Sequence, residues 1–154
     1  MNRRLLIIEI VVFVAIAALL FFFALAKDRG SMVNNSNVDK AIVKAEKVQV
    51  FMFHATARCS SCIAIGQLAS VTLNEYFSDE LQSGRIEFRE INIDLPENKE
   101  LAFKFKASGS AFKINAIYDG SDHISEDVTV WRLLSDTTQF KNYLKGKIDN
   151  ILGK

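Results

Sequence analysis

The sequence predicts a three-layer α/β domain, with a mixed four-stranded sheet between helices, preceded by one N-terminal transmembrane or signal helix. Between 47 and 154, strand-like and helix-like segments follow one another in the order β-α-β-α-β-β-α. The only two cysteines form a Cys-Ser-Ser-Cys motif at 59–62, where the first strand gives way to the first helix. We therefore expect a signal anchor or signal peptide at 1–26, a tether at 27–46 and the folded domain at 47–154.

The N-terminal segment has the length and composition of a membrane anchor. Residues 5–26 are apolar except for Glu9, and roughly 20 apolar residues span a bilayer as a helix. Arg3 and Arg4 precede the segment, so the positive-inside rule keeps the amino end in the cytoplasm. We expect an inner-membrane anchor in a bacterial cell envelope, with the domain on the extracytoplasmic side.

A cleaved signal peptide is the alternative for the same segment. Ala24-Leu25-Ala26 has the small-x-small pattern of a cleavage site. Cleavage after Ala26 would leave the domain secreted or periplasmic. Both interpretations export the domain.

The first half of the domain is expected to hold two strands and two helices. Residues 47–53 are rich in Val and Phe, which is typical of a central strand buried on both faces. Apolar residues at helical spacing then predict a helix from 60 to a stop at Gly84. Alternating residues at 85–93 predict the second strand, and a second helix follows through about Lys106, with Asp94 as its N-cap.

The second half is expected to add a strand pair and a helix. Residues 111–118 form the third strand, and Asp119-Gly120 is a tight-turn signal. Residues 127–134 are expected to be the fourth strand, and the final helix begins after Ser135-Asp136. A right-handed crossover followed by a hairpin gives a mixed sheet covered on both faces.

Charge and motif content exclude several function classes. The 19 Lys and Arg residues balance the 18 Asp and Glu residues, and no basic stripe with interleaved aromatic residues is present. The sequence also has no Gly-rich phosphate loop. We therefore expect no nucleic-acid partner. As a separate expectation, the protein is a monomer.

The cysteine pair has the placement that activates a thiol. A helix N-terminus offers free amide donors and a positive dipole end, both of which stabilise a thiolate. Cys59 would lie near the N-cap and Cys62 one turn further on, within bridging distance. Arg58 adds a cation beside Cys59 and should lower the pKa of that thiol further. We predict Cys59 as the nucleophile, Cys62 as the resolving cysteine and Arg58 as a thiolate-stabilising residue.

Element order together with the motif at 59–62 resembles the thioredoxin fold over 47–152. More loosely, Phe-His-x-x-x-Arg-Cys-x-x-Cys at 53–62 behind an export segment is similar to small thioredoxin-like proteins identified as nitrophenyl-compound nitroreductase subunits. The thioredoxin resemblance implies a dithiol that exchanges with protein disulfides.

Three departures from the thioredoxin pattern surround the dithiol. Arg58 stands where thioredoxins place Trp, and Ser-Ser replaces Gly-Pro between the cysteines. Phe53 falls at or near the position of a buried Asp that assists the resolving cysteine. The loop facing the dithiol has Ser110-Ala111 in place of a cis-proline, so these two residues are the expected substrate-facing pair. A cis bond there costs about 2.5–4 kcal/mol, and we expect it to be trans.

We predict an extracytoplasmic thiol–disulfide oxidoreductase that exchanges its Cys59–Cys62 pair with a protein partner. No cofactor is required, since the dithiol itself carries the electrons. A reductant in this oxidising compartment would need a membrane electron donor.

Two alternatives belong to other functional classes. The first is a metal-binding or metal-delivery module, for copper, without redox turnover. Its ligands would be Cys59 and Cys62, alone or together with His54, because thiolates suit Cu(I). The second is a degenerate thioredoxin-like binding domain without turnover. His54, at the end of the first strand, is expected to be half-buried, with a base near the dithiol or a metal ligand as its other roles.

Overall fold

The computed structural model describes residues 44–154. The predicted anchor or signal peptide at 1–26 and the tether up to residue 43 lie outside the described residues. In residues 44–154, no helix is both long and apolar enough to cross a membrane. Ala45 already belongs to the folded domain, because it is buried and its amide donates to the carbonyl of Ile151 over 3.0 Å.

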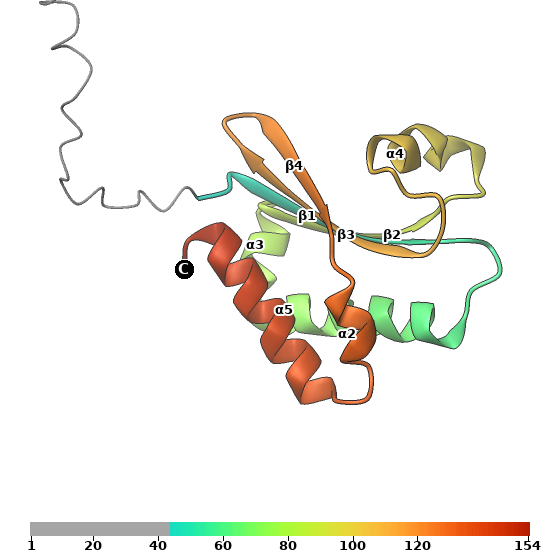
Figure 1. Cartoon of the computed structure of the whole chain (residues 1–154). Coiled ribbons are helices and arrows are strands. Elements are labelled where there is room, and N and C mark those ends of the chain that lie inside the picture. The colour runs from blue at the N-terminus through green and yellow to red at the C-terminus, as the bar shows by residue number, and fades with distance from the viewer. Residues whose placement is uncertain (1–43) are drawn as a thin grey trace, which may run out of the picture. The chain divides into compact units, whose positions relative to one another are not determined.

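Four strands form one mixed sheet in the order β2-β1-β3-β4 (Figure 1). The central strand β1 (Lys47–His54) runs parallel to β2 (Ile86–Asn92) and antiparallel to β3 (Ala111–Tyr118). The edge strand β4 (Ser121–Glu126) pairs antiparallel with β3. Residues Val50 to His54 of β1 are all buried, which confirms the predicted central strand.

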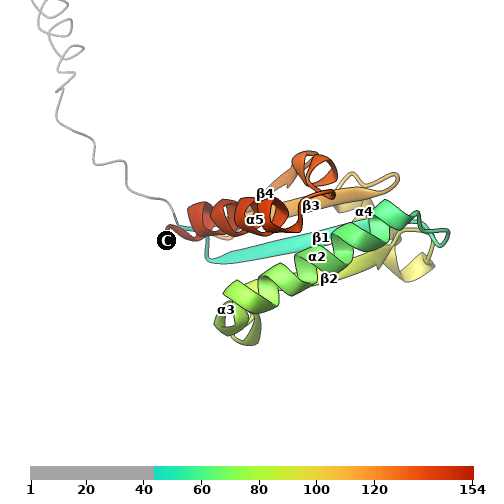
Figure 2. The ribbon, with the colours of Figure 1, turned by 90° about the horizontal axis from the view of Figure 1, so that it is seen from below.

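Helices cover both faces of the sheet and make three layers. The long helices α2 (Ser60–Tyr76) and α5 (Thr137–Leu152) lie on one face, and the short helix α4 (Lys99–Lys104) lies on the other (Figures 1 and 2). The final helix begins as predicted, because the Asp136 carboxylate accepts the amide of Gln139 over 2.9 Å.

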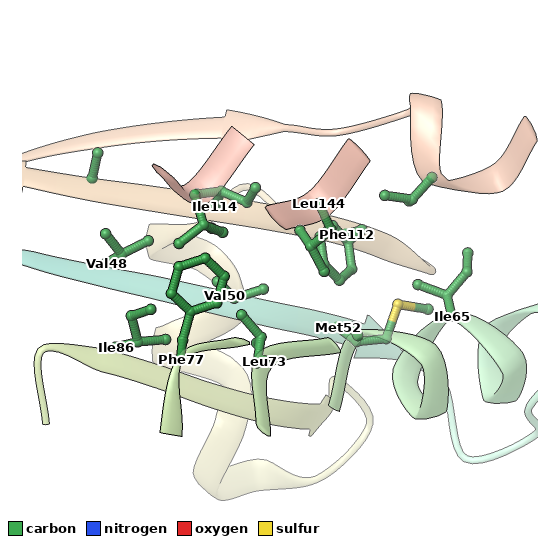
Figure 3. Packing of buried hydrophobic residues seen from close by; sticks show 14 of the residues in the cluster. Val48, Val50, Met52, Ile65, Leu73, Phe77, Ile86, Phe112, Ile114 and Leu144 are labelled. Atoms are coloured by element: carbon green, nitrogen blue, oxygen red, sulfur yellow. The ribbon is translucent and has the colours of Figure 1, made fainter. Parts of the chain in front are cut away.

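Each face of β1 contributes to a separate apolar cluster, since successive side chains of a strand point to opposite faces. Val48, Val50 and Met52 pack toward α2 and α5 in the larger cluster (Figure 3). Phe51 and Phe53 point toward α4 in the smaller cluster, where their ring centroids lie 5.0 and 5.5 Å from that of Phe105. The order of the strands, their directions and the helices on both faces give the domain a thioredoxin-like fold.

The first helix ends earlier than predicted, because helical geometry is interrupted at Phe77. Phe77 leaves helical geometry with φ −137° and ψ 32°, and its side chain is buried in the larger cluster (Figure 3). A separate short helix, α3 (Ser78–Gln82), follows and ends before Gly84. The expectation of one continuous helix to Gly84 is therefore wrong. Burial of the Phe77 ring outweighs helix continuity here.

The second helix is also shorter than predicted. A 3₁₀ turn, η2 (Pro96–Asn98), precedes α4, and Lys106 then adopts a positive φ of 52°. Asp94 does not cap this helix as predicted. Its carboxylate accepts the amide of Thr56 over 2.8 Å instead, and this hydrogen bond lowers the pKa of Asp94. Asp94 thus ties the end of β2 to the loop that follows β1.

The fourth strand was predicted at 127–134, and this prediction is wrong. The Asp119-Gly120 turn does form, and the pairing of Tyr118 with Ser121 starts β4 immediately after it. A two-residue turn leaves no room for the strand to start later. All residues of β4 except Ile124 are exposed, so the strand carries no apolar signal in the sequence.

The apolar residues of that predicted strand form a 3₁₀ turn, η3 (Thr129–Arg132), that packs on the core. Val130 is fully buried and Trp131 packs against the larger cluster. The buried carboxylate of Asp127 fixes this turn to α5 by accepting the Tyr143 hydroxyl at 2.8 Å and pairing with Lys147 at 2.7 Å.

Replacing Asp127 by Ala should destabilise the domain by about 3 kcal/mol, because it leaves the Tyr143 hydroxyl and a partly buried Lys147 without their partner. Urea unfolding of the full chain, followed by the fluorescence of its single tryptophan, Trp131, measures this loss. Asp149→Ala is the matched control, since within residues 44–154 the Asp149 carboxylate forms an i,i+4 pair with Lys145 and no other ion pair. The control should cost less than about 1 kcal/mol. Equal losses in the two variants would contradict the role of Asp127.

The contribution of Lys147 should depend on pH in a defined direction. Partial burial of its ammonium lowers the pKa of Lys147, but the hydrogen bond and charge of Asp127 outweigh it and leave the pKa raised. A raised folded-state pKa stabilises the fold below the unfolded-state value, and this stabilisation is lost as pH rises through the folded-state value. The stability gap between wild type and Asp127→Ala should therefore narrow in strongly alkaline urea titrations, and a widening gap would contradict this sign.

Candidate active site

The two cysteines form a disulfide at the N-terminus of α2. Their Cα atoms lie 5.3 Å apart. Cys59 is the N-cap of the helix, and its Sγ accepts the amide hydrogen of Cys62 over 3.3 Å. This sulfur therefore takes the place of the side-chain oxygen that normally caps a helix. The predicted N-cap position of Cys59 is confirmed.

The two sulfur-bearing residues differ in exposure. Cys59 is exposed, whereas Cys62 is only 1% exposed and belongs to the larger apolar cluster. A partner thiol or disulfide can therefore reach the first residue of the pair and not the second. The amide donors and dipole of α2 act at this same exposed residue.

Arg58 makes contacts that the sequence did not reveal. Its Nη2 forms an ion pair with Oε2 of Glu90 on β2 and donates to the carbonyl of Cys62 over 3.3 Å. The sequence does carry one signal for Glu90. It stands in strand phase with Ile86 and Phe88, which pack against the larger cluster, so a charge at this position faces α2.

The loop before β3 also reaches the disulfide. Ser110 Oγ lies 3.2 Å from Cys62 Sγ, and only the hydroxyl can donate in this contact while the disulfide is intact. Among residues 44–154 no peptide bond is cis, so the bond between Ser110 and Ala111 is trans, as expected. Ser110 is exposed and Ala111 is buried, so the hydroxyl is the accessible group of the predicted substrate-facing pair.

His54 and Phe53 lie at the end of β1, and both are buried. His54 is 9% exposed, more buried than expected, and its Nδ1 lies 2.9 Å from the carbonyl oxygen of Ala55. Because a carbonyl only accepts, Nδ1 carries the proton in this contact. Phe53 is fully buried against Phe105, so no carboxylate stands at this point of β1.

A three-ligand metal site would require His54 or another donor beside the two sulfurs. In the described part of the chain, no three His, Cys, Asp or Glu side chains are grouped so that they could hold a metal ion. With the cysteines in a disulfide, His54 is not assembled with them into the three-ligand set of the copper alternative.

No protein-family model and no curated protein matches the chain by sequence. Among solved structures, zinc-bound human ERp44 is similar, with 18% identity and a TM-score of 0.48 over 75% of this chain and 31% of that chain. Oxidised thioredoxin O2 from Arabidopsis thaliana has 19% sequence identity and a TM-score of 0.41, and the match covers 70% of this chain and 83% of that chain. A thioredoxin from Thermus thermophilus has 17% sequence identity and a TM-score of 0.39, and the match covers 66% of this chain and 76% of that chain.

These likenesses are distant, and the chain spans about a third of the length of ERp44. The fold assignment therefore rests on the topology itself. The strand order β2-β1-β3-β4 and the disulfide at the start of α2 define a thioredoxin-like domain with a Cys-x-x-Cys disulfide.

Ser110→Ala should slow the attack of Cys62 on a mixed disulfide at Cys59 about fivefold. The Ser110 hydroxyl is placed to donate to the Cys62 sulfur, and one such hydrogen bond is worth about 1 kcal/mol. Stopped-flow measurement of how fast Cys62 resolves a Cys59–glutathione mixed disulfide tests this. Ser108→Ala, an exposed serine of the same loop, is the control. If both variants resolve at the wild-type rate, the Ser110 contact has no kinetic role.

Proposed function

We propose that this protein is an exported, membrane-anchored thiol–disulfide oxidoreductase that exchanges its Cys59–Cys62 pair with a partner protein. The observation that carries the proposal is the asymmetry of the pair. An exposed Cys59 caps α2 and is bonded to a buried Cys62. A purely structural bridge gains little from closing so short a loop, and it needs no accessible sulfur.

In the reducing direction, exchange proceeds in two displacements. The Cys59 thiolate attacks a sulfur of the partner disulfide, forms a mixed disulfide and releases one partner thiolate, which takes up a proton. The Cys62 thiol loses its proton, and its thiolate then attacks the Cys59 sulfur and releases the second partner thiolate. The Cys59–Cys62 disulfide forms, and two electrons have passed to the partner. The same steps run backwards when the protein acts as an oxidant.

Each group of the site supports one step of this sequence. The N-terminus of α2 stabilises the Cys59 thiolate that starts the reaction. Ser110 lies against the Cys62 sulfur that completes it. The electrons stay on sulfur throughout, so the exchange itself needs no cofactor.

The location and the electron supply are parts of the same proposal. The apolar segment 5–26 after Arg3 and Arg4 supports an inner-membrane anchor with the domain outside the cytoplasm. In that oxidising compartment a reductant must be reduced again after each cycle. A membrane protein that carries thiols is the electron donor we propose for that case.

Replacing Cys62 by Ser should trap the partner. The mixed disulfide at Cys59 would lack its resolving thiol and would accumulate as a complex that dissociates on addition of dithiothreitol. A synthetic peptide that contains a disulfide serves as the partner, and non-reducing gel electrophoresis of the full chain measures the adduct. Cys59→Ser should form at least about tenfold less adduct, because Cys62 is buried. Equal trapping by both variants, or by neither, would contradict the assigned roles.

A further inference from the structure

Beside the two sulfurs, Arg58 of the active-site loop and Glu90 of β2 form an ion pair that also contacts α2. The Arg58 guanidinium, adjacent in sequence to Cys59, meets the Glu90 carboxylate through Nη2, and the same nitrogen donates to the Cys62 carbonyl over 3.3 Å. The side chains of Arg58 and Glu90 are only 25% and 31% exposed. The pair is therefore partly shielded from solvent, and its charges act more strongly than those of an open surface pair.

Gly66 provides the space for the Glu90 carboxylate. A Cβ on Gly66 would lie 2.8 Å from the carboxyl carbon and from both oxygens of Glu90. Gly66 is buried in the interior of α2, one turn beyond Cys62. A glycine there destabilises a helix by roughly 1 kcal/mol relative to Ala. The close approach of the Glu90 carboxylate explains why a residue without a side chain occupies position 66.

The contacts of Arg58 are made through its Nη2 atom, which meets both Glu90 and the Cys62 carbonyl. Its Nε is buried and has no hydrogen-bond partner among residues 44–154. The position of Arg58 is thus set by Glu90 and the Cys62 carbonyl.

We propose that Glu90 is a positioning residue that offsets the charge of Arg58 and so makes the Cys59–Cys62 pair more reducing than Arg58 alone would. The inference rests on the proposed exchange function. Reduction creates an anion at Cys59, which a free cation beside it would stabilise. Pairing with Glu90 removes most of that preference. The sequence-based role of Arg58 is therefore modified by a residue on another strand.

Single substitutions should shift the redox equilibrium in opposite directions. In glutathione buffer, the disulfide form and two glutathione molecules exchange with the dithiol form and one glutathione disulfide. Glu90→Gln should favour the dithiol about tenfold, which corresponds to a potential about 30 mV higher. Arg58→Gln leaves Glu90 unpaired and should favour the disulfide by a similar factor. The double variant should lie within about twofold of wild type, because the two effects depend on one pair.

Gly66→Ala tests the same pair without removing a charge. A methyl group on Gly66 would overlap the end of the flexible Glu90 side chain, which must then move. We expect the helix to be retained and the Arg58–Glu90 contact to be weakened. This variant should shift the equilibrium in the same direction as Glu90→Gln. Gly146→Ala is the matched control, because a methyl group added to Gly146 in α5 would have nothing within 4 Å. Glu87→Gln controls for the loss of a strand β2 carboxylate that pairs with Lys47 instead.

The experiment compares these full-length variants in detergent by thiol alkylation and gel shift after equilibration with glutathione. Opposite shifts for Glu90→Gln and Arg58→Gln, with both controls at the wild-type value, support the proposal. Shifts in the same direction, or a Glu90→Gln equilibrium within twofold of wild type, would overturn it. If Gly66→Ala matches Gly146→Ala, the role assigned to Gly66 is wrong. A wild-type protein with no reversible equilibrium would instead refute the proposed function, so the two failures are distinct.

Discussion

The site depends on the hydrogen bond from the Cys62 amide to the Cys59 sulfur. It caps α2 and places Cys59 at the positive end of the helix. The same helix packs Cys62 into the larger apolar cluster over the sheet. One cysteine is thereby exposed and the other buried, although only two residues separate them. A different start for α2 would lose both the cap and this difference in exposure.

The surroundings of the disulfide are assembled from distant parts of the chain. Glu90 comes from the edge strand β2 and contacts Arg58. Ser110 comes from the loop before β3 and contacts Cys62. Because β1 lies between β2 and β3, the ends of these segments meet beside the first turn of α2. The topology thus brings a carboxylate to Arg58 and a hydroxyl to the Cys62 sulfur from outside the motif.

Features encoded by neighbouring residues could be predicted from the sequence. The caps at Cys59 and Asp136 are local signals, and the structure confirms both. The polar edge strand β4 carries no apolar pattern, so the apolar segment after it was mistaken for the strand. The break at Phe77 depends on tertiary burial of its ring. The pairing of Arg58 with Glu90 joins residues far apart in sequence, and only the packing of α2 on β2 brings them together.

The most direct test of the account is the reduction potential of the Cys59–Cys62 pair in the full-length protein, with metal content assayed on the same sample. An exposed, helix-capping cysteine bonded to a buried partner predicts a reversible two-electron couple in glutathione buffer, without stoichiometric metal. A protein that carries a stoichiometric metal ion on its sulfurs, or whose thiols show no reversible couple, would contradict the assignment as an exchange-active dithiol.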